Sequence, residues 1–509
     1  MDKVFIVMYK LKPDEGGGIN RAVMNRSKNL TERGYDVSIL TFGDFNTKKV
    51  EEKFRKMDRL DKRVKLLNIY DYYRNKNART KITKSQMKYY KKSAKLYEKG
   101  YQVQIDESKM FARYFNNGIY TKYKRWKKNG DLSHINYFNE SRKRIAREEF
   151  HASGYVTKKT YYDPANKKPM QTLYYTRDGF CFLHSWYTKN NNLGKHFLFD
   201  RNSQEVKLFN SNSEFYTHWL NRLCLKQIRK PYVICDSAGS APKVMNMEQD
   251  IAYRIYVIHT NHFKHPHEVG SPIKPEIKKI LDNLKEVDRV VVLTDKQKQD
   301  ITKEFNDYGN VYVIPHNVQE VSNEKIKKNK TVSIIARLSP IKQISHAIEA
   351  FQQVVQEIPD ARLEIRGTGR QEEKLRKKIV TLNLSQNVFL KGYAYNTDLV
   401  YKRSLFTLLT SKYEGFSLVI LESMANGTPV ISYDVNYGPS DIITDGEDGY
   451  LIKQDKQVLA DKMIELLKNP KQARKMGKIA KKNVLKMFNE KRVIDKWVQL
   501  FNDLKKERP

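Results

Sequence analysis

One stretch in the last third of the chain alternates so regularly between apolar, turn-forming and helix-forming residues that it determines the local fold. The apolar run 405–410 has the length of a buried strand. After a short loop, Ser417 can cap a helix, Gly427 can end it, and Pro429 prevents it from continuing. A second apolar run, 430–433, is typical of the next strand. A strand, a helix and a strand in this order predict neighbouring strands of a parallel sheet.

Two acidic residues lie at the start of this predicted helix. Glu414 is in the loop, and Glu422 is more than one turn into the helix. Because ligands of a parallel sheet bind at the carboxyl ends of its strands, both carboxylates are expected at a binding edge. The amides of Phe416, Ser417 and Leu418 are expected to point to the same place, where a helix N-terminus suits phosphate. Two acids at this spacing also occur by chance on a loop and an exposed helix face.

The same alternation of strands and helices extends over much of the chain. It covers residues 331–433 and predicts a doubly wound sheet there. A second such region begins at the N-terminus with a strand at 4–8, a glycine-rich turn, and a turn and second strand at 34–41. Four further strands are predicted between 232 and 315. The helix between the first two strands carries one apolar stripe, formed by Ile19, Ala22, Val23 and Leu30.

A segment of different character interrupts the first α/β region. Tyrosine, lysine and arginine dominate residues 72–130, and short alternating segments separated by turn residues follow from Gln102 onward. This pattern predicts an antiparallel meander inserted into the first domain. The chain is therefore divided into a first domain, an insertion, a second domain and a terminal helix: residues 1–75 with 229–322, 76–228, 323–485 and 486–509. The terminal helix can either cross back to the first domain or pack on its own domain.

Composition excludes several classes of protein. The chain is 39% hydrophobic in periodic blocks, so it is not disordered, and no apolar run is long enough to cross a bilayer. No cleavable signal begins it, and three dispersed cysteines favour a reducing cytosol. The net charge of +37 indicates an acidic partner such as a nucleic acid, an anionic membrane surface or a polyanionic substrate. Solvated lysine-rich faces would give the same number.

The residues around the two glutamates read Glu-Gly-Phe-Ser, Leu-Glu-Ser-Met-Ala and Gly-Thr-Pro-Val, and they resemble the E-x7-E motif of retaining glycosyltransferases, in particular family 4. Such enzymes have the GT-B fold, in which two Rossmann-like domains face a cleft. The resemblance implies that Glu414 lies near the donor sugar and its diphosphate, and that Glu422 accepts the ribose hydroxyls. It implies reaction on one face of the sugar, with the leaving phosphate taking the acceptor's proton. The pair is therefore not the carboxylate dyad of a retaining glycosidase.

Further donor-binding residues follow from the same resemblance. Arg337 and Lys342 match the family's cation pair, and a diphosphate leaving group needs fixed cations when no metal is present. His259, at a predicted strand end, is assigned to the donor sugar. The remaining residues assigned to the donor site are Gly17 and Gly18 of the first turn, Gly367 of a tight turn, Tyr393 beside the nucleobase, and the loop residues Gly415, Phe416, Ser417 and Leu418.

Four histidines near Glu268 suggest zinc binding as an alternative for one part of this site. They are His259, His262, His265 and His267. Their spacing matches no closed zinc pattern, so neither a metal nor another cofactor is expected. The three histidines other than His259 are expected at the surface, with His267 packed under Pro266.

Two further segments narrow the resemblance to the wall teichoic acid α-glycosyltransferases. They are the N-terminal Glu15-Gly-Gly-Gly-Ile with Met24-Asn-Arg-Ser-Lys28, and a β-rich insertion with Thr172-Leu-Tyr-Tyr and Phe180-Cys-Phe-Leu. These enzymes transfer glucose or N-acetylglucosamine from a UDP-sugar to poly(ribitol phosphate) or poly(glycerol phosphate) in α linkage. A polyphosphate acceptor would explain the basic charge. The resemblance also implies homo-oligomers, as trimers, that form through the insertion. From the cysteines and the charge we expect a cytoplasmic protein that contacts the anionic inner face of the membrane.

Three other functions stay open at this point. A glucosaminyltransferase of serine-rich surface proteins would have a similar insertion. Its acceptor is a peptide, however, which accounts less well for the strong positive charge of this chain. A nucleic-acid-binding protein would use the basic aromatic segments, but it leaves the E-x7-E pattern, Arg337 and Lys342 unexplained. We therefore expect no nucleic acid partner. A lectin-like protein that has lost catalysis would fit the fold, but Glu414 and Lys342 argue against it. The donor sugar and the acceptor polyol are not resolved by the sequence.

Overall fold

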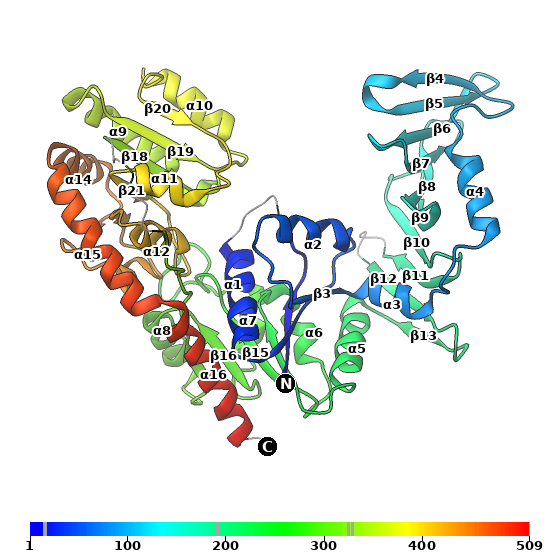
Figure 1. The fold of residues 1–509 in the computed structure, drawn as a ribbon, viewed down its shortest axis with the longest axis horizontal. Helices are drawn as coiled ribbons and strands as arrows, with labels where there is room; N and C mark the ends of the chain where they lie inside the picture. Colours follow the sequence, from blue (N-terminus) through cyan, green and yellow to red (C-terminus); the bar gives the residue numbers. More distant parts are fainter. Residues whose placement is uncertain (14–17, 189–192, 323–325, 327–329, 508–509) are drawn as a thin grey trace.

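The computed structural model describes residues 1–13, 18–188, 193–322, 326 and 330–507. Gly17, one of the residues assigned to the donor site, lies outside these ranges. The second domain and the insertion rise from opposite ends of the first domain, so that the molecule has the outline of a U (Figure 1).

The first domain is built on a seven-stranded parallel sheet in the order β17-β16-β15-β14-β1-β2-β3. Its chain leaves after β3 for the insertion and returns at β14, which pairs directly with β1. The strands are β1 Lys3–Met8, β2 Asp36–Thr41, β3 Lys65–Asn68, β14 Tyr232–Cys235, β15 Tyr253–Val257, β16 Arg289–Val292 and β17 Val311–Val313. The helices around them are α1 Gly18–Glu32, α2 Thr47–Lys56, α3 Ile69–Asn77, α6 Ala241–Met245, α7 Pro275–Leu281 and α8 Asp295–Phe305.

The predicted apolar stripe of α1 is correct for three of its four residues. Ala22, Val23 and Leu30 are buried, whereas Ile19 is 40% exposed. The first turn of α1 lies against the second domain instead of over the sheet, since a Cβ on Gly18 would be 3.3 Å from Leu418 Cδ1. Ile19 is therefore outside the core that buries the rest of the stripe.

The insertion contains a ten-stranded antiparallel meander whose strands pair in chain order from β4 to β13. Helix α4, Lys84–Ala94, covers one face, where Tyr89 Oη donates a 2.6 Å hydrogen bond to Glu148 and Tyr90 packs on Phe150. The strands are β4 Gln102–Asp106, β5 Phe111–Asn116, β6 Ile119–Trp126, β7 Leu132–Phe138, β8 Arg144–His151, β9 Tyr155–Tyr162, β10 Pro169–Tyr175, β11 Cys181–Tyr187, β12 Leu193–Phe199 and β13 Val206–Phe209.

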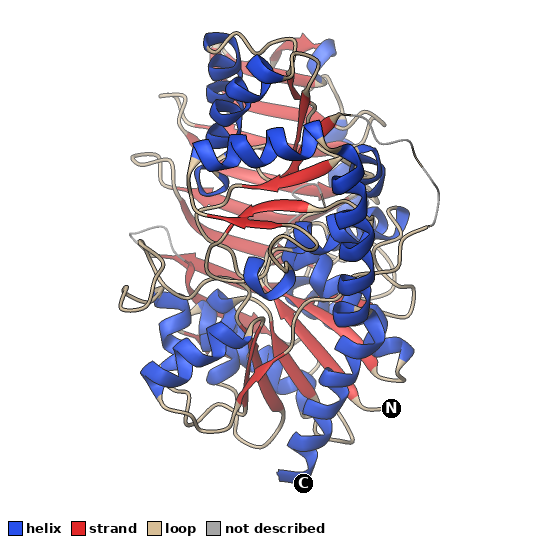
Figure 2. Ribbon diagram, turned by 90° about the vertical axis from the view of Figure 1, so that its left-hand side faces the viewer, coloured by secondary structure: helices blue, strands red, loops and turns tan. Residues whose placement is uncertain are grey.

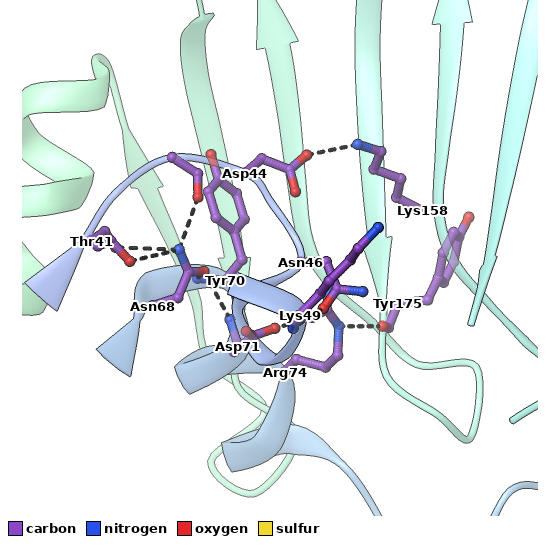
Figure 3. Close-up of polar contacts among 11 residues, drawn as sticks. Thr41, Asp44, Asn46, Lys49, Asn68, Tyr70, Asp71, Arg74, Lys158 and Tyr175 are labelled. Atoms are coloured by element: carbon purple, nitrogen blue, oxygen red, sulfur yellow. Dashed lines mark hydrogen bonds and ion pairs between the residues drawn. The ribbon is translucent and has the colours of Figure 1, made fainter. Parts of the chain in front are cut away.

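The insertion is anchored to the first domain by a shared core and by polar contacts. Phe182 and Leu183 of β11, together with residues of α5 (Asn212–Cys224), pack in one cluster with Phe5 and Val7 of β1. Figure 3 shows the polar junction, where Lys158 pairs with Asp44 at 2.7 Å. The base of the meander is thus continuous with the first domain's hydrophobic core.

The second domain has a six-stranded parallel sheet in the order β20-β19-β18-β21-β22-β23. Its strands are β18 Thr331–Ile335, β19 Arg362–Arg366, β20 Val388–Leu390, β21 Phe406–Leu409, β22 Val430–Tyr433 and β23 Tyr450–Ile452. Its helices are α9 Ile344–Glu357, α10 Glu372–Thr381, α11 Thr397–Arg403, α12 Leu418–Ala425, α13 Pro439–Ile442, α14 Lys456–Lys468 and α15 Pro470–Phe488. The strand, helix and strand predicted around Glu414 and Glu422 are β21, α12 and β22.

The last helix, α16 (Glu490–Glu507), crosses back to the first domain (Figures 1 and 2). Trp497, Leu500 and Phe501 lie in one buried cluster with residues of β1 and β2. The Phe501 ring stacks on Tyr232 of β14, with ring centroids 4.1 Å apart. Of the two arrangements that the sequence left open, the structure has the crossing one.

Phe501→Leu is expected to lower the free energy of unfolding by about 1–2 kcal/mol, because leucine fills most of the volume but loses the aromatic stack. Urea denaturation followed by tryptophan fluorescence would measure this loss. The control is Lys491→Gln, which changes an exposed side chain on the same helix. It should leave the urea concentration at the unfolding midpoint unchanged. Equal midpoints for wild type and Phe501→Leu would contradict a stabilising role for this stack.

Candidate functional site

The centre of the candidate site is an ion pair between two loops at the carboxyl-terminal edge of the second sheet. Lys342 Nζ lies 2.5 Å from Glu414 Oε1, and Ser411 donates a 2.6 Å hydrogen bond to the same oxygen. The loop of Lys342 is fixed to the loop of Glu414 because Thr410 donates to the Lys342 carbonyl at 2.9 Å. Two residues that are 72 positions apart are thereby brought together.

The first turn of α12 lies directly beside this pair, but it is not capped as the sequence suggested. Ser417 occupies the N-cap position with φ +76°, and its hydroxyl makes no capping hydrogen bond. Capping requires an extended backbone, so the left-handed conformation keeps the hydroxyl from the helix amides. Within the described residues, the amides of Phe416, Ser417 and Leu418 have no backbone or side-chain acceptor. These amides are therefore available to an anion.

Glu422, one turn further along α12, already has two partners. Arg21 of α1 in the first domain forms an ion pair with Oε1, and Tyr401 donates to Oε2 at 3.2 Å. No sequence motif assigns a role to Arg21. The only signal in the sequence is a basic residue one turn after the glycine-rich turn.

Two loops of the second domain approach each other so closely that only glycine fits between them. A Cβ on Gly367, where φ is +143°, would be 1.8 Å from the Ala336 carbonyl oxygen, and the Gly367 amide donates to the Gly392 carbonyl at 2.8 Å. This packing positions the loop that carries Arg337. Arg337 is exposed and has no ion pair with any residue that the structure describes. Its guanidinium is available to a ligand.

Tyr393 follows Gly392, at the place where the resemblance puts a nucleobase. Its ring contacts Tyr395 edge-on, with centroids 5.0 Å apart. Its hydroxyl is buried without a partner among the described residues. A buried hydroxyl normally has a hydrogen-bond partner, so this one is available to a bound molecule.

His259 lies just after β15 in the first domain and is held by a buried charge network. Its Nε2 is 2.6 Å from Asp236 Oδ1, and the other Asp236 oxygen pairs with Arg26. Burial alone would raise the pKa of Asp236, but Arg26 and His259 hold it below its ordinary value. His316 stacks on His259 with centroids 5.4 Å apart, and burial holds the pKa of His316 well below the ordinary value.

This network leaves one ring nitrogen of His259, Nδ1, buried and without a partner among the described residues. When Nε2 carries the proton that faces Asp236, Nδ1 is an acceptor. No sequence motif pointed to Asp236 or Arg26, although Asp236 directly follows β14 at the same edge of the sheet.

The two domains touch at Gly415. A Cβ on Gly415 would be 2.2 Å from the His259 carbonyl oxygen. Asn261 donates to the Asn436 carbonyl at 3.2 Å, and Tyr437 donates to Asp300 at 2.6 Å, so hydrogen bonds surround this contact. The backbone of the Glu414 loop is thereby placed against the backbone of the His259 loop.

The remaining histidines differ from the prediction in two cases. His262 is fully buried, with its ring parallel to Tyr437 and centroids 5.9 Å apart, so it is not a surface residue. The ring of His267 packs on Tyr413 of the second domain, with centroids 3.8 Å apart, so it does not simply lie under Pro266. His265 is exposed as expected. Among the described residues, no three His, Cys, Asp or Glu side chains are grouped to hold a metal ion.

Comparison with known proteins gives the chain a family. Residues 317–483 match the model of the glycosyl transferases group 1. The poly(ribitol-phosphate) alpha-N-acetylglucosaminyltransferase of Staphylococcus aureus (strain COL) is 30% identical over 509 residues, which cover 99% of this chain and 100% of that protein. The poly(glycerol-phosphate) alpha-glucosyltransferase of Bacillus subtilis (strain 168) is 30% identical over 73% of this chain and 56% of its own length.

The structural comparison agrees with the sequence comparison. The crystal structure of an S. aureus TarM mutant in complex with fondaparinux, alpha-GlcNAc-glycerol and UDP matches with a TM-score of 0.89 and 29% identity, over 99% of this chain and 100% of that one. The predicted fold class, GT-B with an antiparallel β-rich insertion in the first domain, is therefore confirmed. The chain belongs to the family of group 1 glycosyl transferases that includes the poly(ribitol-phosphate) alpha-N-acetylglucosaminyltransferase of S. aureus.

Proposed function

We propose that the chain is a retaining, family 4 hexosyltransferase that moves glucose or N-acetylglucosamine from a UDP-sugar onto polyol-phosphate repeats of wall teichoic acid, in α linkage. The observation that carries this proposal is the Lys342–Glu414 ion pair beside the unpartnered amides of α12, in contact with the His259 loop of the other domain. The 30% sequence identity to the S. aureus protein, over 100% of that protein, supports a polyol phosphate as the acceptor.

The arrangement suits the loss of a diphosphate. When the bond between the sugar C1 and the phosphate oxygen breaks, negative charge collects on the leaving group. Lys342, Arg337 and the amides at the start of α12 stabilise that charge, and Glu414 holds Lys342 in place. The leaving phosphate oxygen takes the proton of the acceptor hydroxyl, and the new glycosidic bond forms on the same face of the sugar.

The rest of the donor is held by residues on both domains. Glu422 accepts the ribose hydroxyls, because a carboxylate can accept two such hydrogen bonds. Tyr393 contacts the nucleobase, and the unpartnered Nδ1 of His259 accepts from a hydroxyl of the sugar. Gly18, at the start of α1, is close enough to Leu418 to contact the same ligand through its backbone.

The acceptor and the location of the protein are proposed from charge. Each repeat of a polyol phosphate is an anion, and a net charge of +37 favours its binding. The same charge supports contact with the anionic inner face of the membrane from the cytoplasm. Within the described residues, no helix is both long and apolar enough to span a bilayer. Association into homo-oligomers, as trimers through the insertion, stays a prediction.

Release of UDP tests the proposed function. We expect turnover with either UDP-glucose or UDP-N-acetylglucosamine and with either poly(ribitol phosphate) or poly(glycerol phosphate). We also expect the rate to be unchanged in EDTA, because fixed cations replace a metal. Transfer to a serine-rich peptide, with no turnover on either polymer, would favour the peptide glucosaminyltransferase instead. Inactivity with all acceptors, together with salt-sensitive binding to nucleic acid, would refute the enzyme proposal.

A further inference from the structure

We propose that Arg21 is a donor-binding residue that changes partners when the nucleotide arrives. In this structure it pairs with Glu422, and in the complex with the nucleotide it pairs with the diphosphate while the ribose takes Glu422. This inference rests on the proposed function, because that function assigns the ribose hydroxyls to Glu422. Neither the sequence motifs nor the resemblance assigned a role to Arg21.

The first observation is that the ribose-binding carboxylate is occupied. Arg21 donates from Nη1 to Glu422 Oε1, and the Tyr401 hydroxyl donates to Oε2 at 3.2 Å. The side chains of Arg21 and Glu422 are only 22% and 17% exposed, so this is not a solvated surface pair. A ribose hydroxyl that binds Oε1 at the position of the guanidinium displaces Arg21.

The second observation is that the predicted phosphate site lies about one helical turn from the present partner of Arg21. The first turns of α1 and α12 lie side by side, since a Cβ on Gly18 would be 3.3 Å from Leu418 Cδ1. Arg21 and Glu422 each lie one turn further along their helix, a rise of about 5.4 Å. Helical side chains lean toward the helix N-terminus. A change of rotamer would therefore bring the guanidinium from Glu422 to the end of α12 where the unpartnered amides lie.

The chemistry of arginine explains why the exchange would be favourable. A guanidinium stays charged and binds phosphate through two parallel hydrogen bonds. Arg21 Nε is buried without a partner among the described residues, so the side chain has a donor to spare. A diphosphate provides a new anionic partner when Glu422 is lost, whereas a nucleoside provides none. Arg21 should therefore favour UDP over uridine.

Calorimetric titration with uridine and with UDP would test this inference. In Arg21→Met, uridine is expected to bind about threefold tighter or more, because it no longer displaces an ion pair. The preference for UDP over uridine is expected to fall by about tenfold or more, because the diphosphate loses a charged partner. Arg21→Lys keeps the charge but loses the bidentate contact. Its preference for UDP over uridine should therefore lie between those of wild type and Arg21→Met. Lys28→Met, on the exposed face of α1, is the matched control and should change neither affinity.

The outcomes separate this inference from the proposed function. Suppose that the wild type binds UDP, but Arg21→Met changes the affinities for uridine and UDP by the same factor or weakens the binding of uridine. The exchange of partners is then refuted and the proposed function stands. If the wild type binds neither uridine nor UDP, both are refuted. Thermal unfolding of each variant shows whether Arg21→Met is folded, and Arg21→Lys supplies the comparison if it is not.

Discussion

Lys342→Gln is expected to reduce the kcat for sugar transfer by about 10²–10³-fold, which corresponds to roughly 2.7–4 kcal/mol of lost transition-state stabilisation. Of Lys342 and Arg337, the two cations proposed to hold the diphosphate, only Lys342 has an ion pair among the described residues, with Nζ 2.5 Å from Glu414 Oε1. Its side chain is only 24% exposed, so water replaces its charge poorly. The loss should fall on kcat more than on KM, since the charge on the diphosphate grows as the bond breaks.

Steady-state UDP release, with both substrates varied, would measure this effect. The matched control is Lys412→Gln, which removes an exposed positive charge from the adjacent loop. It should keep kcat within about threefold of wild type, because exposed charges are largely screened. A kcat for Lys342→Gln that equals the control's would show that another group stabilises the leaving diphosphate.

Gly415→Ala is expected to lower kcat/KM by about 10²-fold or more without unfolding either domain. The added Cβ would lie 2.2 Å from the His259 carbonyl oxygen and 2.8 Å from Thr260 Cα. Both are backbone atoms, so neither can move away by a change of rotamer. The domains must separate instead, and a displacement of about 1 Å at a catalytic site can cost this much rate.

Two measurements distinguish this effect from a folding defect. The melting temperature should stay near that of wild type, because Gly415 has an ordinary φ and its surroundings within the second domain are unchanged. Gly239→Ala is the control, since a Cβ there meets nothing within 4 Å, and it should keep full activity. Normal activity for Gly415→Ala would mean that the active arrangement does not require this close approach of the domains.

The strands and helices of the second domain could be predicted from the sequence because they depend on residues that are close together in the chain. Apolar runs of strand length, a helix-ending glycine and Pro429 between strand and helix predicted β21, α12 and β22. The parallel order of the strands then placed Glu414, Lys342 and the start of α12 at one edge. The meander was also predictable, because its strands pair with their chain neighbours and its turns carry asparagine, glycine and proline.

Two of the details that differ from the prediction, at Ser417 and His262, show how backbone geometry or neighbours override local preference. Serine is a common N-cap residue, but the backbone of Ser417 has φ +76°. In this conformation its hydroxyl cannot reach the helix amides. His262 has the sequence context of a surface residue, but the approach of Tyr437 from the other domain buries it. Neither cause can be seen from the adjacent residues.

The sequence alone therefore determined which segments form sheets and which carboxylates and cations lie at their edges, because hydrophobic period and turn chemistry act over a few residues. Only the tertiary structure decided how the two domains meet. It brought Arg21 to Glu422 across 401 positions, placed Asp236 and Arg26 behind His259, and laid α16 on the first domain. These contacts depend on the packing of surfaces that are distant in the chain, and no local pattern of residues encodes that packing.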